Sequence, residues 1–398
     1  MSECDLRVAG FRFGAVKAGI RGKDRLDLGL ICAERPASAA GVFTTNRVKA
    51  APVLLDQERI KSGRAQAILV NSGIANACTG AQGLALARLA AGKAASALGI
   101  DEELVQVSST GVIGQQLDPA CFEHLPRLEA NLSPEGGMEV ARAIMTTDTV
   151  PKTARRTVAI GGATATLAGI AKGSGMIQPN MATMLAYILT DAAVAPAVLQ
   201  GLLRASVAQS FNRITVDGDT STNDTVLLLA SGQAGHSEIT DPASPEAARL
   251  QAALDDLSRD LALQIVADGE GATKLATIRV EGAPSEAAAE QAARTVANSP
   301  LVKTAFFGQD ANWGRIIAAL GRSGIEFEPD QVDIAFDQAQ IVKSGLWLGP
   351  AAEAAATEVL RQKAFTVHIA LGQGEAACAI HTCDLSLDYV KINADYRS

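Results

Sequence analysis

The chain has 398 residues, of which 48% are hydrophobic and 20% are charged, and it carries a net charge of −8. This length suggests two or three domains with ordinary globular cores. The negative charge argues against a general nucleic-acid binder, which needs a basic surface, and favours small-molecule partners.

The N-terminal region shows no targeting segment. Charged residues interrupt it throughout, so we expect no secretory signal. No apolar run reaches the length that spans a bilayer, so we expect no membrane association. The six cysteines are scattered along a long chain and do not form a disulfide framework. These features predict a protein of the reducing cytoplasm.

The first half of the chain alternates short β-like runs with glycine turns and alanine-rich helices. Its predicted β-like runs are Ala67–Val70, Val105–Ser108, Thr157–Ile170 and Met184–Leu189, and its predicted helices are Leu84–Leu98 and Pro196–Ala208. Polar turn residues then cluster at His236–Pro245 and mark a break in the chain.

The second half continues the mixture of helices and strands. Its predicted helices are Ala247–Val266 and Glu286–Ser299, and its predicted strands are Lys274–Val280, Val332–Phe336, Phe365–Ala370 and Ala377–Leu385. This mixture predicts α+β layers, with a smaller domain in the last third of the chain.

The segment KGSGMIQPNMATML, which begins at Lys172, carries the most chemical information. Two glycines and Pro179 turn the backbone sharply before Thr183. Ala182 leaves its carbonyl sterically open, so the Thr183 hydroxyl could attack it and turn the amide into an ester that water cuts. The product would be a chain that begins at Thr183 with a free α-amine.

A threonine hydroxyl is a weak nucleophile, and an adjacent N-terminal amine can act as its general base. An α-amino pKa of roughly 7.7–8.0 leaves a useful neutral fraction near neutral pH. No histidine is then required, and none of the four histidines lies beside a Ser or Cys in a recognised nucleophile motif. The alternative interpretation of the same residues is a glycine-rich loop between two strands.

The processing segment resembles that of the ornithine acetyltransferase family, the bifunctional glutamate N-acetyltransferases. The resemblance covers nearly the whole chain, because further segments follow in family order. They are AGIRGKDRLDLGLI, GVFTTNRVKAAPV, VNSGIANACTG, SSTGVIG, AIMTTDTVPK, FNRITVDGDTSTNDT, ADGEGATK, LVKTAFFGQDANWGRI and YVKINADYRS. One departure is Ile74, where the family usually carries Asn.

The resemblance implies an α+β fold, a layered α/β/β/α sandwich formed by both self-cleavage fragments, with a smaller C-terminal α/β domain. The α fragment would be residues 1–182 and the β fragment residues 183–398. Residues 183–240 would complete the sandwich, and residues 241–398 would include the smaller domain. An α₂β₂ heterotetramer is also implied.

The resemblance further implies transfer of the acetyl group of N²-acetyl-L-ornithine to L-glutamate, in cyclic arginine biosynthesis, through an acetyl-Thr183 intermediate. No cofactor is expected, and acetyl-CoA is left open as a second acetyl donor. The runner-up function is an N-terminal-nucleophile aminopeptidase or amidase, which would use the same cut and the same threonine. A non-enzymatic scaffold would instead remain a single intact chain.

Thr110 and Gly111 match the family's oxyanion pair. A threonine hydroxyl and a glycine N–H can stabilise the negative oxygen of a tetrahedral intermediate, and one such donor is worth about 2.7–4 kcal/mol of barrier. The alternative is a helix N-cap that follows a strand.

Thr146, Lys172, Thr183 and Glu270 match the family's substrate contacts, with Thr147 an alternative to Thr146. A lysine can bind a carboxylate, and a glutamate can bind an ammonium group; ordinary solvated surface residues are the alternative. Asn393 and Ser398 match the family's C-terminal contacts, although a frayed tail is the default for such positions. If the segment Tyr389–Ser398 is extended, Asn393 lies on the face opposite to its apolar anchors.

Two other patterns suggest metal sites only superficially, and no metal is expected. Phe211–Asp224 is rich in carboxylates but lacks EF-hand spacing, so a buried polar network that supports the site is the preferred interpretation. Cys378, His381 and Cys383 do not share one face of a strand, and no fourth zinc ligand has the right spacing.

Overall fold

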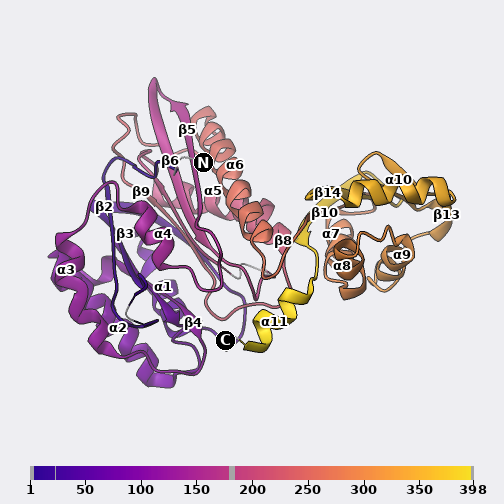
Figure 1. Ribbon diagram of the computed structural model, residues 1–398. Coiled ribbons are helices and arrows are strands. Elements are labelled where there is room, and N and C mark those ends of the chain that lie inside the picture. The colour runs from indigo at the N-terminus through magenta and orange to yellow at the C-terminus, as the bar shows by residue number, and fades with distance from the viewer. Residues whose placement is uncertain (1–3, 23, 179–183, 396–398) are drawn as a thin grey trace. The chain divides into compact units, whose positions relative to one another are not determined.

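The computed structural model describes residues 4–22, 24–178 and 184–395 (Figure 1). Within these residues the strands form two sheets, and the chain divides into two compact units. The first unit contains the residues up to Asn212 together with Asp219–Ile265. The second contains Arg213–Gly218 and the chain from Val266 onward. The predicted α+β class is confirmed.

The sheet of the first unit has eight strands in its described part, in the order β4-β3-β2-β9-β7-β6-β5, with β1 paired to β2 off this path. They are β1 (Phe11–Val16), β2 (Leu28–Phe43), β3 (Arg64–Ile74), β4 (Val105–Val112), β5 (Lys152–Ile160), β6 (Ala163–Lys172), β7 (Leu185–Thr190) and β9 (Thr225–Ala230). The pairs β3–β4 and β7–β9 are parallel, and the others are antiparallel. The long strand β2 pairs with β3 through Leu28–Ser38 and with β9 through Ser38–Phe43.

The predicted run Thr157–Ile170 contains the end of β5, a hairpin turn and most of β6. Strands β5 and β6 pair from Ile160↔Ala163 to Lys152↔Ala171 around Gly161 and Gly162. Both glycines have positive φ, at 56° and 86°, which is the backbone that a tight two-residue hairpin turn requires. The alternation of small and β-branched residues continues through both strands, so it conceals the turn.

Helices cover the first sheet. They are α1 (Ala51–Arg59), α2 (Gly80–Leu98), α3 (Leu125–Ala130), α4 (Gly137–Ala143), α5 (Pro196–Gln209) and α6 (Pro245–Ala267). Ala67 and Leu69 of β3 pack in the cluster that contains α2 and α3, whereas Ile68 and Val70 face a second cluster. Strand β3 is therefore buried on both faces, which explains its continuous apolar run.

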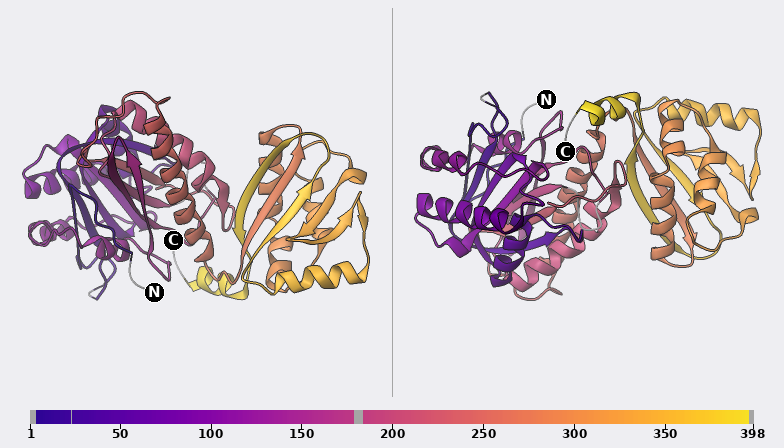
Figure 2. Two further views of the ribbon diagram at one scale, coloured as in Figure 1. Left: turned by 90° about the horizontal axis from the view of Figure 1, so that it is seen from above. Right: turned by 90° about the horizontal axis from the view of Figure 1, so that it is seen from below.

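Apart from Arg213–Gly218, the second unit starts at Val266, later than residue 241, where the range expected to include the smaller domain began. The reason is the packing of α6, whose buried leucines are spaced to share one face. A Cβ on Gly169 of β6 would lie 2.7 Å from Leu261 and 2.9 Å from Leu257, so α6 rests directly on the first sheet. Gln251 also donates to the carbonyl of Leu202, which places α6 beside α5 (Figures 1 and 2).

The sheet of the second unit has seven strands in its described part, in the order β13-β12-β11-β14-β10-β15-β8. They are β8 (Ile214–Thr215), β10 (Leu275–Ala283), β11 (Asp333–Phe336), β12 (Ala339–Lys343), β13 (Leu346–Trp347), β14 (Ala364–Ala370) and β15 (Ala376–Cys383). The helices are α7 (Glu286–Ala297), α8 (Pro300–Phe307), α9 (Trp313–Gly321), α10 (Pro350–Leu360) and α11 (Leu387–Asp395). Alternate residues of β10 and β14 are buried in one cluster with α7 to α10, so these helices cover one face of the sheet (Figure 2).

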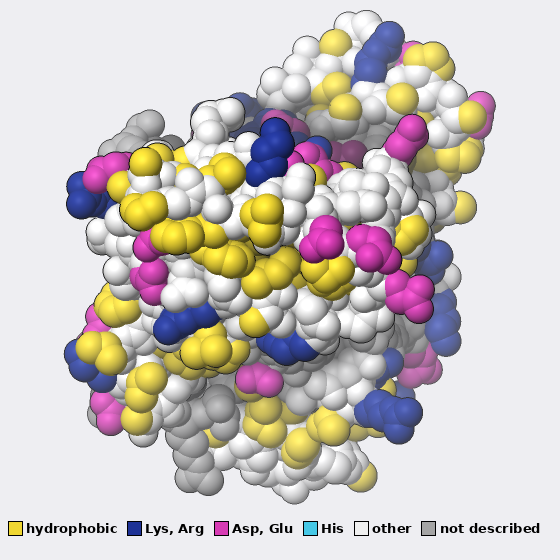
Figure 3. Space-filling view, turned by 90° about the vertical axis from the view of Figure 1, so that its right-hand side faces the viewer, with side chains coloured by type: hydrophobic (Ala, Val, Ile, Leu, Met, Phe, Trp, Pro, Cys, Tyr) yellow, Lys and Arg dark blue, Asp and Glu magenta, His cyan; other side chains and the backbone are white. Residues whose placement is uncertain are grey.

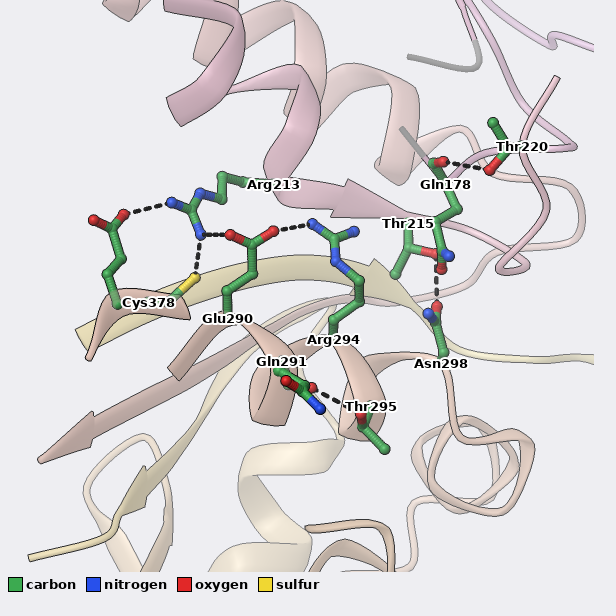
Figure 4. Close-up of polar contacts among 11 residues, drawn as sticks. Gln178, Arg213, Thr215, Thr220, Glu290, Gln291, Arg294, Thr295, Asn298 and Cys378 are labelled. Carbon is green, nitrogen blue, oxygen red and sulfur yellow. Dashed lines mark hydrogen bonds and ion pairs between the residues drawn. The ribbon is translucent and has the colours of Figure 1, made fainter. Parts of the chain in front are cut away.

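Arg213 fixes the short segment Arg213–Gly218 in the second unit (Figure 4). Its guanidinium pairs with Glu286 at 2.6 Å and Glu290 at 2.9 Å, both on α7. It also donates to Cys378 Sγ at 2.6 Å, while β8 pairs in parallel with β15.

The outer edge of the second sheet is β13, which has only two residues. Leu346 and Trp347 are exposed to 72% and 45%. A short edge strand offers few unpaired backbone groups to another chain.

On the face drawn in Figure 3, acidic and basic side chains are interspersed with hydrophobic ones. Within the described residues, no helix is both long and apolar enough to cross a membrane.

Candidate functional site

The candidate oxyanion residues lie where β4 ends beside β3. Thr110 pairs with Ser72, and Gly111 pairs with Gly73, in a parallel register. Gly111 has a φ of 127°, and a Cβ there would lie 2.2 Å from the carbonyl carbon of Gly73. Only glycine fits this close approach. Thr110 thus belongs to a strand end, and the structure does not make it the N-cap of a helix.

Lys172, the last residue of β6, contacts Thr110 through its side chain. The two residues are 62 positions apart in sequence, and both are buried. Lys172 Nζ donates to Thr110 Oγ1 at 3.5 Å. Because the hydroxyl oxygen accepts from the ammonium group, its own proton is directed elsewhere, toward another acceptor. The pair presents a hydroxyl donor beside a positive charge.

Thr146 lies in the loop between α4 and β5, where both of its backbone polar groups are bonded. Its N–H donates to Asp148 Oδ2 at 2.8 Å, and its carbonyl accepts from Arg21 Nη2 at 3.0 Å. Arg21 Nη1 also donates to the carbonyl of Met145. Thr146 is half-buried, as is Thr147, so both side chains remain candidates for substrate contact.

Asp148 is a member of this cluster that the sequence did not reveal. Its Oδ1 accepts from Lys152 Nζ at 2.6 Å and from the Gly173 N–H at 2.7 Å. Burial alone would raise the pKa of Asp148, but the charges of Lys172 and Lys152 hold the pKa below its usual range. The motif AIMTTDTVPK contains Asp148 and Lys152 four positions apart. This spacing could have suggested the Asp148–Lys152 ion pair. The contact with Gly173 could not be predicted in this way, because the two residues are 25 positions apart.

The polar segment before β9 supports this region through Asn223. Its amide donates to the carbonyl of Ala75 at 2.6 Å and to the carbonyl of Ser109 at 2.7 Å. It therefore joins the ends of β3 and β4 next to Thr110. The prediction of a buried polar network in this segment is confirmed for Asn223 and its neighbour Thr222, whose hydroxyl lies 2.5 Å from Asn223 Oδ1.

Asp224 follows in the same segment and is also buried. Burial raises the pKa of its carboxyl well above the usual range, and this effect exceeds the opposing hydrogen bond from the Met184 N–H and the charge of Lys172. Ile74, the departure from the family pattern, acts here through its backbone, because its carbonyl accepts from the Asn71 amide at 2.9 Å.

Glu270 and Asn393 come together within the second unit. Asn393 Nδ2 donates to Glu270 Oε2 at 2.7 Å, and Glu270 is buried. Asn393 lies on helix α11 and not on an extended segment, so the predicted conformation of the tail is wrong. Its amide also donates to the carbonyl of Tyr389, one helical turn earlier. The helix therefore orients Asn393 toward Glu270.

Three predicted site residues, Ala182, Thr183 and Ser398, lie outside the described residues. Thr110, Gly111, Thr146 and Lys172 form one group within the first unit, and Glu270 and Asn393 form another within the second. Among the described side chains, no group of three or more His, Cys, Asp or Glu residues is arranged to hold a metal ion.

Comparisons with known proteins place the chain in a family. Residues 12–398 match the model of the ArgJ family. The arginine biosynthesis bifunctional protein ArgJ of Desulfotalea psychrophila is 54% identical over 394 residues, which cover 99% of this chain and 100% of that protein. The protein of the same name from Geobacter sulfurreducens is 52% identical with equal coverage.

A solved structure gives a similar result. The crystal structure of the arginine biosynthesis bifunctional protein ArgJ of Bacillus halodurans is 42% identical, with a TM-score of 0.51. The match covers 53% of this chain and 98% of that chain. Given a family match over nearly its full length and relatives at more than half identity, the chain belongs to the ArgJ family.

Proposed function

We propose that this protein is an enzyme of arginine biosynthesis, a self-cleaving acetyltransferase. It moves the acetyl group of N²-acetyl-L-ornithine to L-glutamate, with Thr183 as the nucleophile that carries the acetyl group. Thr110 and Gly111 stabilise the oxyanion. Membership of the ArgJ family supports this assignment, because the relatives at 54% and 52% identity are named arginine biosynthesis proteins.

The contact between Lys172 and Thr110 carries the proposal. An oxyanion donor must direct its proton at the oxygen of the intermediate, not at a protein acceptor. Lys172 Nζ lies 3.5 Å from Thr110 Oγ1 and cannot accept the Thr110 proton, so we infer that this proton is donated to the oxygen of the intermediate. The backbones of Gly111 and Gly73 lie so close together that the position of the Gly111 N–H, the second proposed donor, is restricted.

The reaction divides into two acyl transfers. The Thr183 hydroxyl attacks the acetyl carbonyl of acetylornithine while its own α-amine accepts the hydroxyl proton. The tetrahedral intermediate collapses, the C–N bond breaks, and ornithine leaves with that proton on its α-amine. The neutral α-amine of glutamate then attacks the acetyl-Thr183 ester, the acyl C–O bond breaks, and a proton of that amine passes through the Thr183 α-amine to the Thr183 oxygen, which releases N-acetylglutamate and restores the threonine.

Substrate binding uses complementary charges. Lys172 supplies a positive charge for a substrate carboxylate, and Glu270 supplies a negative charge for an ammonium group. The bond from Asn393 orients the Glu270 carboxylate. Thr146 and Ser398 complete the proposed contacts.

Self-cleavage at Ala182–Thr183 would give two fragments of similar length. The solved chain from Bacillus halodurans supports this, because it covers only 53% of this chain while 98% of it is matched. We further propose an α₂β₂ assembly in the cytoplasm and a layered α/β/β/α sandwich. The shared core of β3, β7 and β9 supports the sandwich.

The word bifunctional in the relatives' name supports acetyl-CoA as a second acetyl donor. The same active site would then accept acetyl groups from either donor. Purified protein with glutamate and each donor in turn distinguishes one activity from two.

Intact-mass measurement tests the central proposal. Wild-type protein should appear as two fragments, and acetylornithine alone should make the downstream fragment heavier by one acetyl group. Added glutamate should remove that group. Thr183→Ala should remain one unacetylated chain. Consumption of acetylornithine at the same rate without glutamate would identify an amidase and reject the transferase.

A further inference from the structure

Asp148 lies at the centre of the first-unit cluster and has no role in the function proposed above. Its side chain and that of Lys152 are completely buried. The carboxylate connects three separate points of the fold through the N–H of Thr146, the N–H of Gly173 and the Lys152 ammonium group. All three bonds measure 2.8 Å or less and are charge-assisted, so they hold the local backbone strongly.

The carboxylate is ionised, because the charges of Lys172 and Lys152 outweigh the effect of burial on its pKa. Electrostatic attraction is mutual, so the Asp148 charge favours the protonated form of Lys172. Among the described residues, Lys152 on β5 shares the Asp148 carboxylate with Lys172, and Asp224, which precedes β9, also lies within the influence of the Lys172 charge. Burial raises the pKa of Asp224, whereas the neighbouring lysines lower the pKa of Asp148.

A hydrogen bond from the Gly173 backbone to Asp148 also positions the neighbouring Lys172. The Gly173 N–H follows Lys172 directly in sequence, and its bond to Asp148 measures 2.7 Å. This bond holds the end of β6 at the point where the Lys172 side chain turns toward Thr110. On the opposite side of the carboxylate, the bond to Thr146 holds a second proposed substrate contact.

We propose that Asp148 is a positioning residue for acetyl transfer, which places a negative charge near Lys172, directs Lys172 at the Thr110 hydroxyl and aligns Thr146 with it. This inference rests on the function proposed above. Lys152 is the counter-ion that allows the carboxylate to remain ionised in the interior. The competing explanation is that Asp148 serves only as the buried partner of Lys152.

Two variants separate these explanations. Asp148→Asn keeps the shape of the side chain but leaves the Lys152 charge buried without its partner, which destabilises the fold. Asp148→Asn/Lys152→Met removes both charges and should regain much of the lost melting temperature. If positioning is the role of Asp148, the double variant should remain defective in transfer although it is stable.

Asp191→Asn is the matched control. Asp191 is also buried in the first unit, and it accepts from the Thr166 N–H at 2.7 Å. It has no lysine among the groups that influence its pKa. We expect this variant to lose stability without any change in the pH dependence of transfer.

The experiment measures kcat/KM for acetylornithine against pH in all four proteins. The double variant should lose about 10- to 100-fold in kcat/KM, as misplaced groups at a reacting centre do. The alkaline limb of the pH profile should move down in Asp148→Asn, which removes the anion and keeps Lys152, whereas the loss of Lys152 in the double variant offsets part of that shift. Wild-type kcat/KM in the stable double variant would overturn the inference.

A second measurement does not depend on activity. Lysines labelled with carbon-13 at Cε can be titrated by NMR, and the Lys172 signal is identified by its loss in Lys172→Arg. Its midpoint should fall in Asp148→Asn, which keeps Lys152, and stay constant in Asp191→Asn. An inactive wild type would reject the proposed function, and an unchanged Lys172 midpoint would separately reject the role of Asp148.

Discussion

The contact between Gly111 and Gly73 gives a quantitative prediction for Gly111→Ala. An added Cβ would lie 2.2 Å from the Gly73 carbonyl carbon and 2.4 Å from its oxygen, both of which are backbone atoms that cannot rotate away. Overpacking of this kind costs about 1–3 kcal/mol. The φ of 127° adds about 1–3 kcal/mol of backbone strain for a residue with a side chain.

The expected loss is therefore about 2–6 kcal/mol, a large part of the 5–15 kcal/mol that stabilises a typical domain. Each kcal/mol lowers the Tm by roughly 2–4 °C in a domain of this size. Calorimetry or urea unfolding at equal protein concentration should show a Tm reduction of at least about 4 °C.

Gly114→Ala is the control, because Gly114 also has positive φ, at 83°, and an added Cβ would meet no atom within 4 Å. It should show only the backbone cost of roughly 1–2 kcal/mol. Equal stability of the two variants would refute the steric explanation for Gly111.

Three further predictions concern the site and its surroundings. Thr110→Ala should reduce kcat by about 100- to 1,000-fold with little change in KM, because the oxyanion forms only near the transition state; a raised KM at constant kcat would reassign Thr110 to substrate binding. Removal of residues 393–398 should leave self-cleavage intact but lower kcat/KM for acetylornithine about tenfold or more, through loss of the bond to the Glu270 carboxylate; unchanged kinetics would exclude the tail from the site. Burial raises the pKa of Asp56 well above 3.8, so its contribution to folding stability falls as pH rises above that value. Urea unfolding between acidic and neutral pH should therefore show Asp56→Asn gaining stability relative to wild type as pH increases, and a constant difference would contradict the shift.

Local patterns predicted individual elements well where burial and periodicity agreed. The helix predicted at Pro196–Ala208 is observed at Pro196–Gln209, with proline at its first position. The core of β3 was likewise evident from Ala67–Val70. In contrast, the tail was treated as extended, although Val390 and Asn393 are three positions apart on a helix. The spacing of apolar residues cannot distinguish a strand from a helix in so short a segment.

The candidate site required contacts that no local pattern reveals. Thr110 and Gly111 were recognisable from the resemblance of their motif. Their dependence on Gly73, on Asn223 and on Asp148 arises from segments that meet only in the folded sheet. The packing of α6 on the first sheet is of the same kind, and for that reason the boundary between the units could not be predicted from the polar stretch before it.

The order of strands in the first sheet has a consequence for a chain that has been cut. With cleavage as proposed, β9 and β7 belong to the downstream fragment, yet they lie between β2 and β6 of the upstream one. The fragments could separate only if the β2–β9 and β6–β7 ladders both broke. We expect the intact chain to fold before it is cut, because one continuous chain forms both ladders without an encounter between two molecules. Once unfolded, the mature protein must reassemble from two molecules, so its recovery from denaturant should depend on protein concentration, whereas that of an uncut variant should not.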